Sequence, residues 1–386
     1  MSFTPPVTEQ RFVLEHIAGI ANLAASDRFA DATGDMVDAI LDGAGQLAAG
    51  EWAPLNRIGD TEGAKLTEDG VVMPEGYHAA YQAYVEGGWG TIAAPSDFGG
   101  QGMPFSLAAS ILESLGSANM AFSLCPMLSV GAIEALTHHG SPELQAAYLP
   151  KLSTGEWTGT MNLTEPQAGS DVGALKSKAE PAEDGSWRIK GQKIYITFGE
   201  HDLAENTIHL VLARTPGAPE GTKGISLFLV PRYRLDENGA PGEFNDARAV
   251  SIEHKLGIHA SPTCVMSFGD NDDCHGWLIG PENGGMRAMF TMMNNARLGV
   301  GCQGIGVAEA AFQHALAYAM DRKQGRTAVS GDGAIVDHAD VRRMLLSMKS
   351  DVFAARAIAL SCAVATDMHT ATQDTDWAAR AAFLTP

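Results

Sequence analysis

The feature that most constrains the fold of this chain is a change in residue pattern near residue 157. Before this point the sequence is rich in Ala, Leu, Met and Glu, and segments 35–49 and 106–115 repeat apolar residues at intervals of three and four, which predicts helices. From residue 157 to 280, short alternating or β-branched runs follow one another, and helical spacing returns after Pro281. This pattern predicts an α+β protein in which a β domain lies between two helical domains.

Short segments bounded by turn residues are predicted to be the strands of the central domain. They are residues 187–190, 193–196, 207–213, 224–230, 249–254 and 264–268. Because no helical segment separates them, they favour an antiparallel barrel or sandwich over a sheet built from β-α-β units. We therefore expect an N-terminal helical domain at 1–156, a β domain at 157–280 and a helical bundle at 281–386. The helices predicted for the bundle are 285–293, 298–324 and 341–368.

Composition excludes several classes of protein. The chain has 386 residues, of which 45% are hydrophobic, as in globular proteins. It contains no run of roughly 18 consecutive apolar residues and no recognisable secretory signal, so we predict no membrane insertion and a cytoplasmic location. Its net charge of −20 repels polyanions, which argues against nucleic acid as a partner. The five cysteines include no CxxC pair, so neither a disulfide framework nor a zinc site is predicted.

Two motifs have simpler explanations than ligand binding. Residues 299–304 (GVGCQG) match the dinucleotide pattern GxGxxG, but a helical segment precedes them where that fingerprint requires a strand. We interpret them as small residues that let two helices approach closely. Residues 270–275 (DNDDCH) lack the carboxylate that a calcium loop needs at its twelfth position, which here is Pro281. We interpret this segment as a solvated loop between a strand and a helix, and we predict no metal site.

Three further segments place polar groups where a ligand could bind. Residues 161–171 (MNLTEPQAGSD) form a turn-rich loop at the junction of two domains, where clefts tend to form. Residues 193–197 (KIYIT) alternate, which predicts that Tyr195 and Thr197 share one face of a strand with Lys193. Residues 321–326 concentrate cations that can hold a phosphate. Taken singly, the segments are also typical of a surface loop, an aromatic strand position and the cationic end of a helix.

In this order and at this spacing, the three segments resemble the acyl-CoA dehydrogenase family. Residues 161–171 resemble the first signature of the family, 193–197 the strand that follows it, and 321–324 (DRKQ) a basic element of the C-terminal domain. The similarity extends from about Tyr77 to Met368. It implies an α-helical N-terminal domain, a middle antiparallel β-barrel domain and a C-terminal four-helix bundle that is incomplete in this chain. It also implies a homodimer or a homotetramer.

The resemblance implies FAD as the cofactor and gives individual residues a role. Those expected to line the two sides of the flavin ring are Met161, Leu163, Thr164, Tyr195 and Thr197. Those expected to reach the FAD phosphates of a neighbouring subunit are Arg322, Gln324 and, as a weaker match, His338. Ser170 is expected to face both FAD and the acyl-CoA substrate, and Arg297 to lie along the CoA channel.

The implied reaction converts an acyl-CoA thioester into a trans-2-enoyl-CoA. A carboxylate removes the pro-R α-proton while the β-hydride passes to flavin N5, and the electrons then pass to an electron-transfer flavoprotein or a similar acceptor. The base of this family is a glutamate late in the C-terminal domain or, less often, one just before the arginine matched by Arg297. The second position is Ala296 and the first would fall beyond Pro386, so we expect a truncated or partly represented chain without its base. Glu165 and Asp171 are expected to make structural hydrogen bonds instead.

The segment before Tyr77, which includes residues 51–56 (EWAPLN), resembles the longer bacterial branch of the family. Within that branch the substrate that we favour is 3-methylmercaptopropionyl-CoA, and short- and medium-chain fatty acyl-CoAs remain open. Two other functions also remain open. One is an acyl-CoA oxidase, which passes its electrons to oxygen, and the other is a non-catalytic protein that binds flavin or acyl-CoA.

Overall fold

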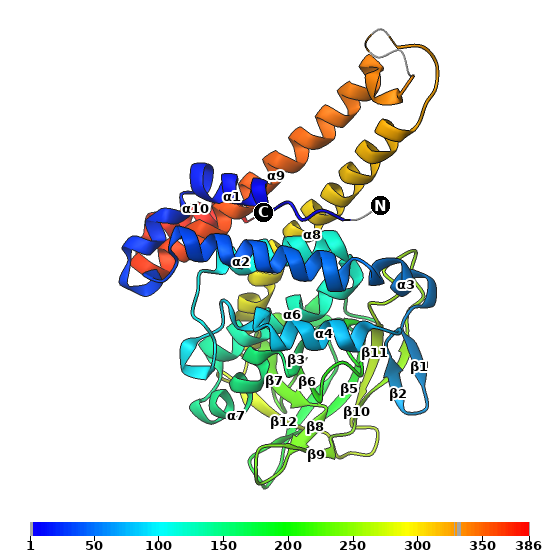
Figure 1. Ribbon diagram of the computed structural model, residues 1–386. Helices are drawn as coiled ribbons and strands as arrows, with labels where there is room; N and C mark the ends of the chain where they lie inside the picture. The colour runs from blue at the N-terminus through cyan, green and yellow to red at the C-terminus, as the bar shows by residue number, and fades with distance from the viewer. Residues whose placement is uncertain (1–2, 328, 330–332, 386) are drawn as a thin grey trace. The chain divides into compact units, whose positions relative to one another are not determined.

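The computed structural model describes residues 3–327, 329 and 333–385 (Figure 1). The chain divides into two compact units, which we describe separately. Unit 1 comprises Met1–Asn56, Met103–Met120 and Arg297–Pro386, and unit 2 comprises Arg57–Gly102 and Ala121–Ala296. The N-terminal and C-terminal helical segments thus share one unit, while the predicted division into three domains at residues 156 and 280 stays a prediction.

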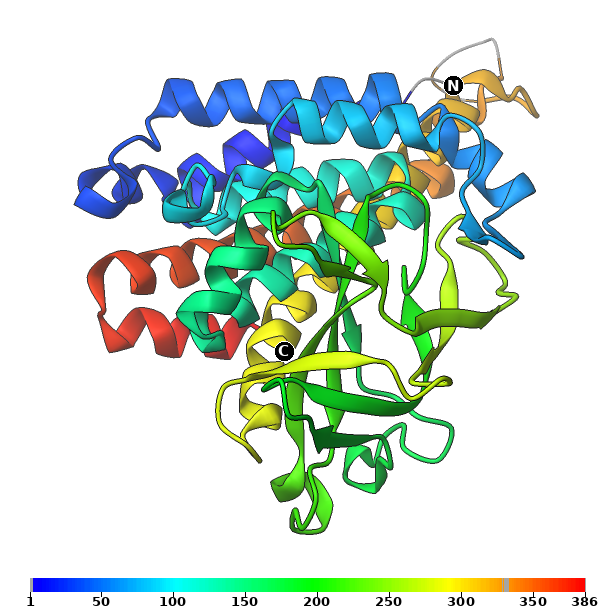
Figure 2. The same ribbon diagram turned by 90° about the horizontal axis from the view of Figure 1, so that it is seen from below.

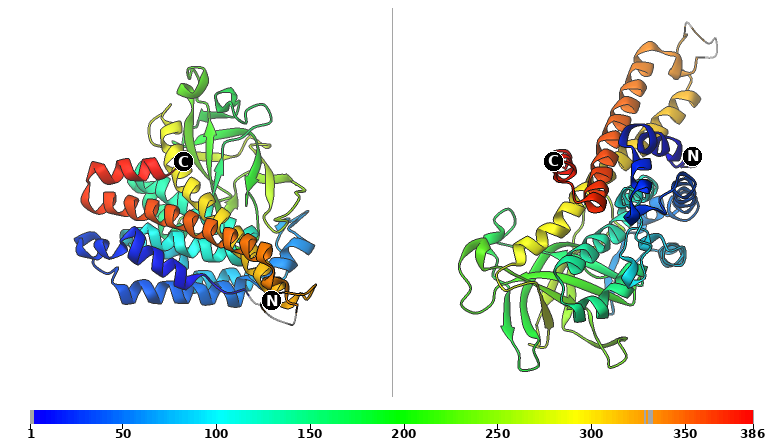
Figure 3. Two further views of the ribbon diagram at one scale, coloured as in Figure 1. Left: turned by 90° about the horizontal axis from the view of Figure 1, so that it is seen from above. Right: turned by 90° about the vertical axis from the view of Figure 1, so that its left-hand side faces the viewer.

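Helices form unit 1. Its α-helices are α1 (Val7–Val13), α2 (Gly34–Leu47), α5 (Phe105–Ala118), α9 (Ala339–Thr372) and α10 (Thr375–Leu384). The part of α8 (Gly285–Asp321) from Arg297 onward also belongs to unit 1. Helix α2 begins where the Thr33 hydroxyl accepts a hydrogen bond from the N–H of Met36, and it buries Val37, Ile40 and Leu41 on one face. Helix α5 contacts both α2 and α9 and is buried on nearly every side, while α9 and α10 lie side by side (Figure 3). The predicted helices 35–49, 106–115 and 341–368 are therefore confirmed.

The predicted helices 285–293 and 298–324 are one continuous helix, α8. Its glycines do not interrupt it, since each costs only about 1 kcal/mol relative to alanine in a helix interior. The helical context confirms that residues 299–304 are not a dinucleotide loop. The close approach predicted for them was misplaced, because no described atom lies within 4 Å of an added Cβ at Gly301 or Gly304. It occurs at Gly306, where a Cβ would lie 2.8 Å from the backbone nitrogen of Ser117 in α5.

Unit 2 is built around one large sheet, whose strands are visible in Figure 2. Its strands run in the order β10-β11-β5-β12-β7-β6-β3, with β4 paired to β5. The bounds are β3 (Trp157–Asn162), β4 (Lys178–Pro181), β5 (Trp187–Thr197), β6 (Asn206–Ala213), β7 (Ser226–Pro231), β10 (Ala247–Ile252), β11 (Thr263–Phe268) and β12 (His275–Ile279). Two short hairpins, β1–β2 (Lys65–Thr67, Gly70–Val72) and β8–β9 (Tyr233–Leu235, Pro241–Phe244), add to them. The predicted strands are confirmed, with 187–190 and 193–196 joined as β5.

Two details of this sheet differ from the predictions. Strands β3 and β6 are parallel, whereas the other pairs in the large sheet are antiparallel among the described residues. Strand β3 follows helix α7 (Pro142–Thr154) and continues into an irregular loop, so no hairpin turn imposes an antiparallel neighbour on it. Residues 270–274 connect β11 to β12, and His275 is the first residue of β12. The prediction of a loop between a strand and a helix is wrong because it omitted β12.

Strands β6 and β7 are buried on both faces. Leu210 and Leu229 belong to a core shared with helix α6 (Met120–His139) and α7, whereas Val211 and Phe228 belong to a second core with β5, β10 and β11. Successive side chains of a strand point to opposite faces, so an apolar run without polar alternation fills both cores. This position between two cores explains why β6 is buried along its whole length.

The remaining α-helices among the described residues are α3 (Leu55–Glu62) and α4 (Tyr77–Glu86).

Helices α6 and α9 are long and apolar enough to cross a membrane by length and composition. In α6, 78% of the most apolar stretch is buried inside the protein. A helix in the core of a protein passes the same test, so these two helices give little support to membrane insertion. The absence of insertion stays a prediction.

Candidate functional site

The loop that follows β3 is joined to strand β5 by two hydrogen bonds. The N–H of Ile194 donates to the carbonyl of Thr164 (2.9 Å), and the ammonium of Lys193 donates to the carbonyl of Leu163 (3.0 Å). The side chains of Met161, Leu163 and Thr164 are half-buried. Two of the three segments singled out in the sequence, 161–171 and 193–197, therefore meet in one place within unit 2.

A buried ion pair lies beneath this junction. Lys193 and Glu165 are 0% and 3% exposed, and Nζ donates to Oε1 over 2.8 Å. The carboxylate also accepts hydrogen bonds from the backbone N–H groups of Lys176 (2.7 Å) and Ser177 (3.0 Å). Burial alone would raise the pKa of Glu165, but the charge of Lys193 and these hydrogen bonds lower it to about 2. The prediction of a structural role for Glu165 is confirmed.

Tyr195 lies on an irregularity of β5 that the sequence pattern does not reveal. Opposite β11, Cys264 pairs with Ile196 and Met266 pairs with Lys193, so two residues of β5 face one residue of β11. This β-bulge places Tyr195 at a φ of 60° and leaves its side chain 60% exposed. The prediction that Lys193 shares the face of Tyr195 and Thr197 is wrong. The bulge adds one residue to β5 after Lys193, which reverses the alternation of side chains between the two faces of the strand. Thr197 remains on the less buried side with Tyr195.

Ser170 is exposed beyond a tight turn of the same loop. The turn is closed by two backbone hydrogen bonds, from Glu165 N–H to Ala168 carbonyl (3.1 Å) and from Ala168 N–H to Glu165 carbonyl (2.9 Å). Asp171, which follows, is also exposed. The loop is thus anchored at Glu165 and presents Ser170 to solvent, where it is available to a ligand.

The third segment forms a cluster in unit 1, at the end of α8. Arg322 donates to Oε1 of Gln324 (3.0 Å), and Nε2 of His338 lies 2.8 Å from the carbonyl of Gln324. The backbone N–H of Gln324 donates to the carbonyl of Gly333 (2.7 Å), and that of Ile335 donates to the carbonyl of Arg322 (2.8 Å). The structure therefore brings together Arg322, Gln324 and His338, all three residues that the sequence proposed for the FAD phosphates.

Arg297 does not belong to that cluster. It lies in α8, and at 1.5 Å per residue the helix separates it from Asp321 by about 36 Å. Its side chain is exposed and has interactions within the protein. Arg297 and Arg322 can therefore contact only different parts of a ligand.

Two buried histidines contact hydroxyl groups of strand β3, His209 from strand β6 and His201 from the loop between β5 and β6. His209 Nδ1 is 2.7 Å from the Thr160 hydroxyl, and His201 Nε2 is 2.9 Å from the Thr158 hydroxyl. Burial lowers the pKa of each to about 3. Both rings are neutral near pH 7, and we assign them to the packing of the sheet.

The residues present fit a flavin nucleotide. Tyr195, an exposed aromatic residue on a bulge, lies beside the half-buried Thr164, which carries a hydroxyl group. Among the described residues, no group of three or more His, Cys, Asp or Glu side chains could hold a metal ion. The turn around Arg322 supplies a cation in a protein of net charge −20. Sequence reasoning missed the partner of Lys193, and its one signal was a lysine inside an otherwise apolar stretch of strand.

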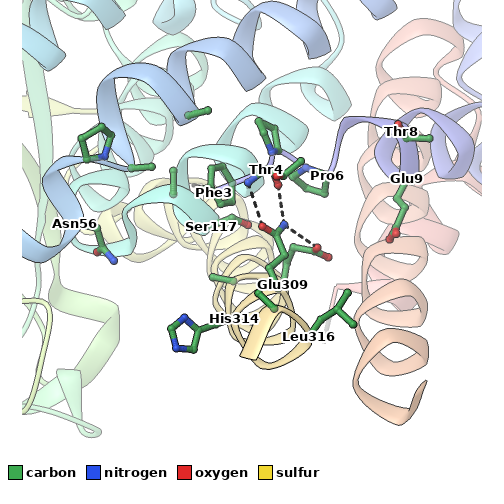
Figure 4. Close-up of a pocket in the computed structure, with 18 of the residues that line it drawn as sticks. Phe3, Thr4, Pro6, Thr8, Glu9, Asn56, Ser117, Glu309, His314 and Leu316 are labelled. Atoms are coloured by element: carbon green, nitrogen blue, oxygen red, sulfur yellow. Dashed lines mark hydrogen bonds between the residues drawn. The ribbon is translucent and has the colours of Figure 1, made fainter. Parts of the chain in front are cut away.

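A cavity of about 930 Å³ lies elsewhere in unit 1 (Figure 4). The N-terminal segment forms one wall, where the backbone of Thr4 and the side chain of Gln313 exchange hydrogen bonds of 3.1 and 2.7 Å. Residues of α8, including Glu309 and His314, form another wall. Its described lining includes none of the candidate residues, so we assign no function to it.

Comparison with known proteins identifies related chains along most of the sequence. Three family models match in order: the acyl-CoA dehydrogenase N-terminal domain at 38–156, the middle domain at 160–271 and the C-terminal domain at 283–383. A 3-methylmercaptopropionyl-CoA dehydrogenase of Ruegeria pomeroyi is 48% identical over 365 residues, which are 94% of this chain and 61% of that protein. A butyryl-CoA dehydrogenase of Syntrophomonas wolfei is 40% identical over 361 residues, which are 90% of this chain and 59% of that protein.

A solved structure shows the same fold. The acyl-CoA dehydrogenase of Bacillus anthracis complexed with FAD superposes with a TM-score of 0.72 at 21% identity, covering 91% of this chain and 54% of that one. The chain spans about three fifths of the length of the two relatives named above. Three family models in the expected order and 48% identity over most of its length show that the chain belongs to the FAD-dependent acyl-CoA dehydrogenase family.

Proposed function

We propose that the protein dehydrogenates an acyl-CoA thioester to a trans-2-enoyl-CoA with FAD as cofactor. The observation that carries this proposal is the junction of the 161–165 loop with the bulge of β5, which places Thr164 and the exposed Tyr195 together. FAD, when bound, supplies the acceptor for the hydride from the β-carbon. The relatives named above support an acyl-CoA as the substrate class.

The chain's own residues bind and orient in this proposal. Met161, Leu163 and Thr164 form one half-buried side of the flavin site, and Tyr195 and Thr197 form the side next to β5. Ser170 contacts the cofactor and the acyl-CoA, and Arg297 binds along the CoA. Arg322, Gln324 and His338 hold the phosphates of an FAD bound to a neighbouring subunit, because a guanidinium and an amide can donate several hydrogen bonds to phosphate oxygens.

The proton must be removed from the α-carbon by another group than Glu165. A general base needs an accessible lone pair and a pKa near the working pH. Glu165 is buried, its oxygens accept hydrogen bonds from Lys193, Lys176 and Ser177, and its pKa is lowered to about 2. We therefore do not propose Glu165 as the base.

The finer proposals concern substrate, partner and location. We propose 3-methylmercaptopropionyl-CoA as the substrate, because the relative of that name shares 48% of its aligned residues with this chain. Butyryl-CoA is the second candidate, since a relative named for that activity shares 40%. An electron-transfer flavoprotein or a similar acceptor, a homodimer or homotetramer and a cytoplasmic location complete the proposal.

Anaerobic titration tests the function. The purified protein with its bound flavin is titrated with 3-methylmercaptopropionyl-CoA, butyryl-CoA and a long-chain acyl-CoA while the absorbance of the oxidised flavin is followed. We expect the first to remove that absorbance at the lowest concentration. Protein that binds acyl-CoA without any loss of oxidised flavin would contradict the dehydrogenase and favour a binding protein. Rapid return of the absorbance on admission of air would identify an oxidase.

A further inference from the structure

We propose that Lys193 is a positioning residue for the flavin site. Together with its strand, β5, it fixes the two peptide groups that flank the α-carbon of Thr164. This inference rests on the proposed function, because it assigns Lys193 a role toward FAD. It begins from the ammonium group, which donates to the carbonyl of Leu163 over 3.0 Å and to Glu165 over 2.8 Å.

The first step concerns the peptide group between Leu163 and Thr164. A peptide group is planar and trans, so its carbonyl and its N–H point in opposite directions. When Lys193 holds the carbonyl of Leu163, it also sets the direction of the Thr164 N–H. A lysine side chain that is 0% exposed has few alternative rotamers, so this direction is set firmly.

The second step concerns the next peptide group. Its carbonyl belongs to Thr164 and accepts a hydrogen bond of 2.9 Å from the N–H of Ile194, the residue after Lys193. The two peptide planes that flank the α-carbon of Thr164 are thus both held by β5. Since the planes determine φ and ψ, they also determine where the Thr164 side chain and N–H point. The same strand carries Tyr195 on its bulge, so one element sets both sides of the site.

Glu165 makes this arrangement possible. A buried ammonium without a counter-charge is strongly unfavourable, and Glu165 supplies that charge while the backbone N–H groups of Lys176 and Ser177 hold it in place. Unit 2 contains a second ion pair, Arg232 and Glu200, at 2.9 Å, in which the carboxylate is also 3% exposed and the arginine 14%. Among the described residues that pair forms no hydrogen bond with Leu163 or Thr164, so it provides a matched control.

The test compares three variants with the unaltered protein. Lys193→Met removes the cation of the first pair, and Arg232→Met removes the cation of the second. The double variant Glu165→Gln with Lys193→Met removes both charges of the first pair, so that it leaves no uncompensated carboxylate. For each protein we measure the thermal midpoint without FAD by circular dichroism, the dissociation constant of FAD by flavin fluorescence after deflavination, and the absorption spectrum of the bound flavin.

We expect both single variants to lower the thermal midpoint, but only Lys193→Met to weaken FAD binding, by about tenfold or more. We expect the double variant to recover much of the thermal midpoint and to keep weak FAD binding and an altered flavin spectrum, because the donor to Leu163 is still missing. Recovery of FAD affinity together with stability in the double variant would overturn the inference. Equal losses of FAD affinity in Lys193→Met and Arg232→Met would overturn it as well.

The same measurements separate this inference from the proposed function. If the unaltered, folded protein binds no FAD, the proposed function fails. If it binds FAD and the double variant binds it equally well, only the role of Lys193 fails, and the pair is a structural ion pair.

Discussion

At residue 195 the chain keeps a tyrosine in a backbone conformation that favours glycine. Its φ of 60° lies in the left-handed region, which costs an L-residue about 1–2 kcal/mol. The side chain is 60% exposed, so little burial offsets that cost within the protein. Strain held at an exposed aromatic residue is typical of a ligand site.

This strain leads to a prediction for Tyr195→Gly. The free energy of unfolding of the FAD-free protein should be no lower than that of the unaltered protein, since glycine adopts this φ without strain. FAD affinity should fall, because the ring that covers the flavin is lost. Urea unfolding and flavin fluorescence measure the two effects. Tyr195→Phe, which keeps the ring, should bind FAD normally, and a Tyr195→Gly protein with normal FAD affinity would show that the ring does not contact the cofactor.

Glu165 gives a prediction for acid stability. Its pKa in the folded protein, about 2, lies below its ordinary value of 4.5. The ionised carboxylate therefore stabilises the fold above about pH 4.5, and this contribution is lost as the pH falls toward 2. Glu165→Gln should lower the free energy of unfolding at pH 7 by about 3–5 kcal/mol, because it leaves Lys193 unpaired. Urea unfolding at pH 7 and pH 3 should show a smaller difference at the lower pH.

At the scale of elements, Arg356 ties four helices of unit 1 together. Its guanidinium is fully buried in α9 and donates to Glu9 of α1 (2.6 Å), Glu113 of α5 (2.8 Å) and Glu309 of α8 (2.9 Å). Gln10 of α1 donates a further hydrogen bond to Glu113 (3.1 Å). Burial raises the pKa of Glu113 although the charge of Arg356 opposes this. The short helix α1 is therefore held by polar contacts at the centre of the unit.

Replacing this arginine should destabilise unit 1. Arg356→Met leaves Glu113 and Glu309 buried without a counter-charge, and we expect the free energy of unfolding to fall by about 3–5 kcal/mol. Hydrogen exchange should show the largest loss of protection in α1. Arg343→Met, in the same helix, removes an exposed partner of Asp340 and should change little. Equal effects of the two substitutions would contradict this account.

The start of α5 is held by a residue distant in sequence. Both carboxylate oxygens of Asp367 in α9 accept hydrogen bonds, from the N–H groups of Phe105 (2.7 Å) and Ser106 (2.9 Å). Burial raises the pKa of Asp367 to about 7, although these N–H groups favour the charged form. Because the folded value exceeds the ordinary value of 3.8, ionisation opposes folding as the pH rises from about 4 to about 7.

Asp367→Asn should reveal this dependence. The variant keeps one oxygen acceptor for the helix but cannot ionise. We expect the advantage of the unaltered protein over the variant, measured as the free energy of unfolding, to be larger at pH 5 than at pH 8. A difference that grows with pH would mean that the carboxylate is stabilised, not opposed, by its surroundings.

At the scale of the whole molecule, the net charge of −20 makes the Arg322 cluster unusual. An anionic cofactor is repelled by the protein at long range and must be held by local donors. Arg322→Glu places a negative charge where we propose that FAD phosphates of a neighbouring subunit lie. We expect FAD content and oligomeric size to fall together, as measured by flavin release and by light scattering. Arg380→Glu, at an exposed position of α10, serves as the control, and an Arg322→Glu protein that keeps both properties would contradict the proposal.

The sequence by itself determined the types of most elements and the family. Apolar spacing of three and four predicts α2, α5 and α9, and the short β-branched runs predict β6 and β7, because these periods depend on residues close in the chain. The candidate residues at the flavin loop and at the end of α8 came from recognisable local motifs. At the end of α8, the contacts of Arg322 and His338 with Gln324 agree with the grouping that the sequence predicted.

Only the tertiary structure decided the features that depend on partners distant in the chain. The bulge that separates Tyr195 from the face of Lys193 arises from the pairing of β5 with β11. The burial of Lys193 depends on Glu165, 28 residues earlier, and the parallel course of β3 depends on its place beside β6. The continuity of α8 through its glycines is stabilised by packing, including the approach of Gly306 to α5. A local pattern carries the period of an element, whereas register and ionic partners are set by the free energy of contacts between elements.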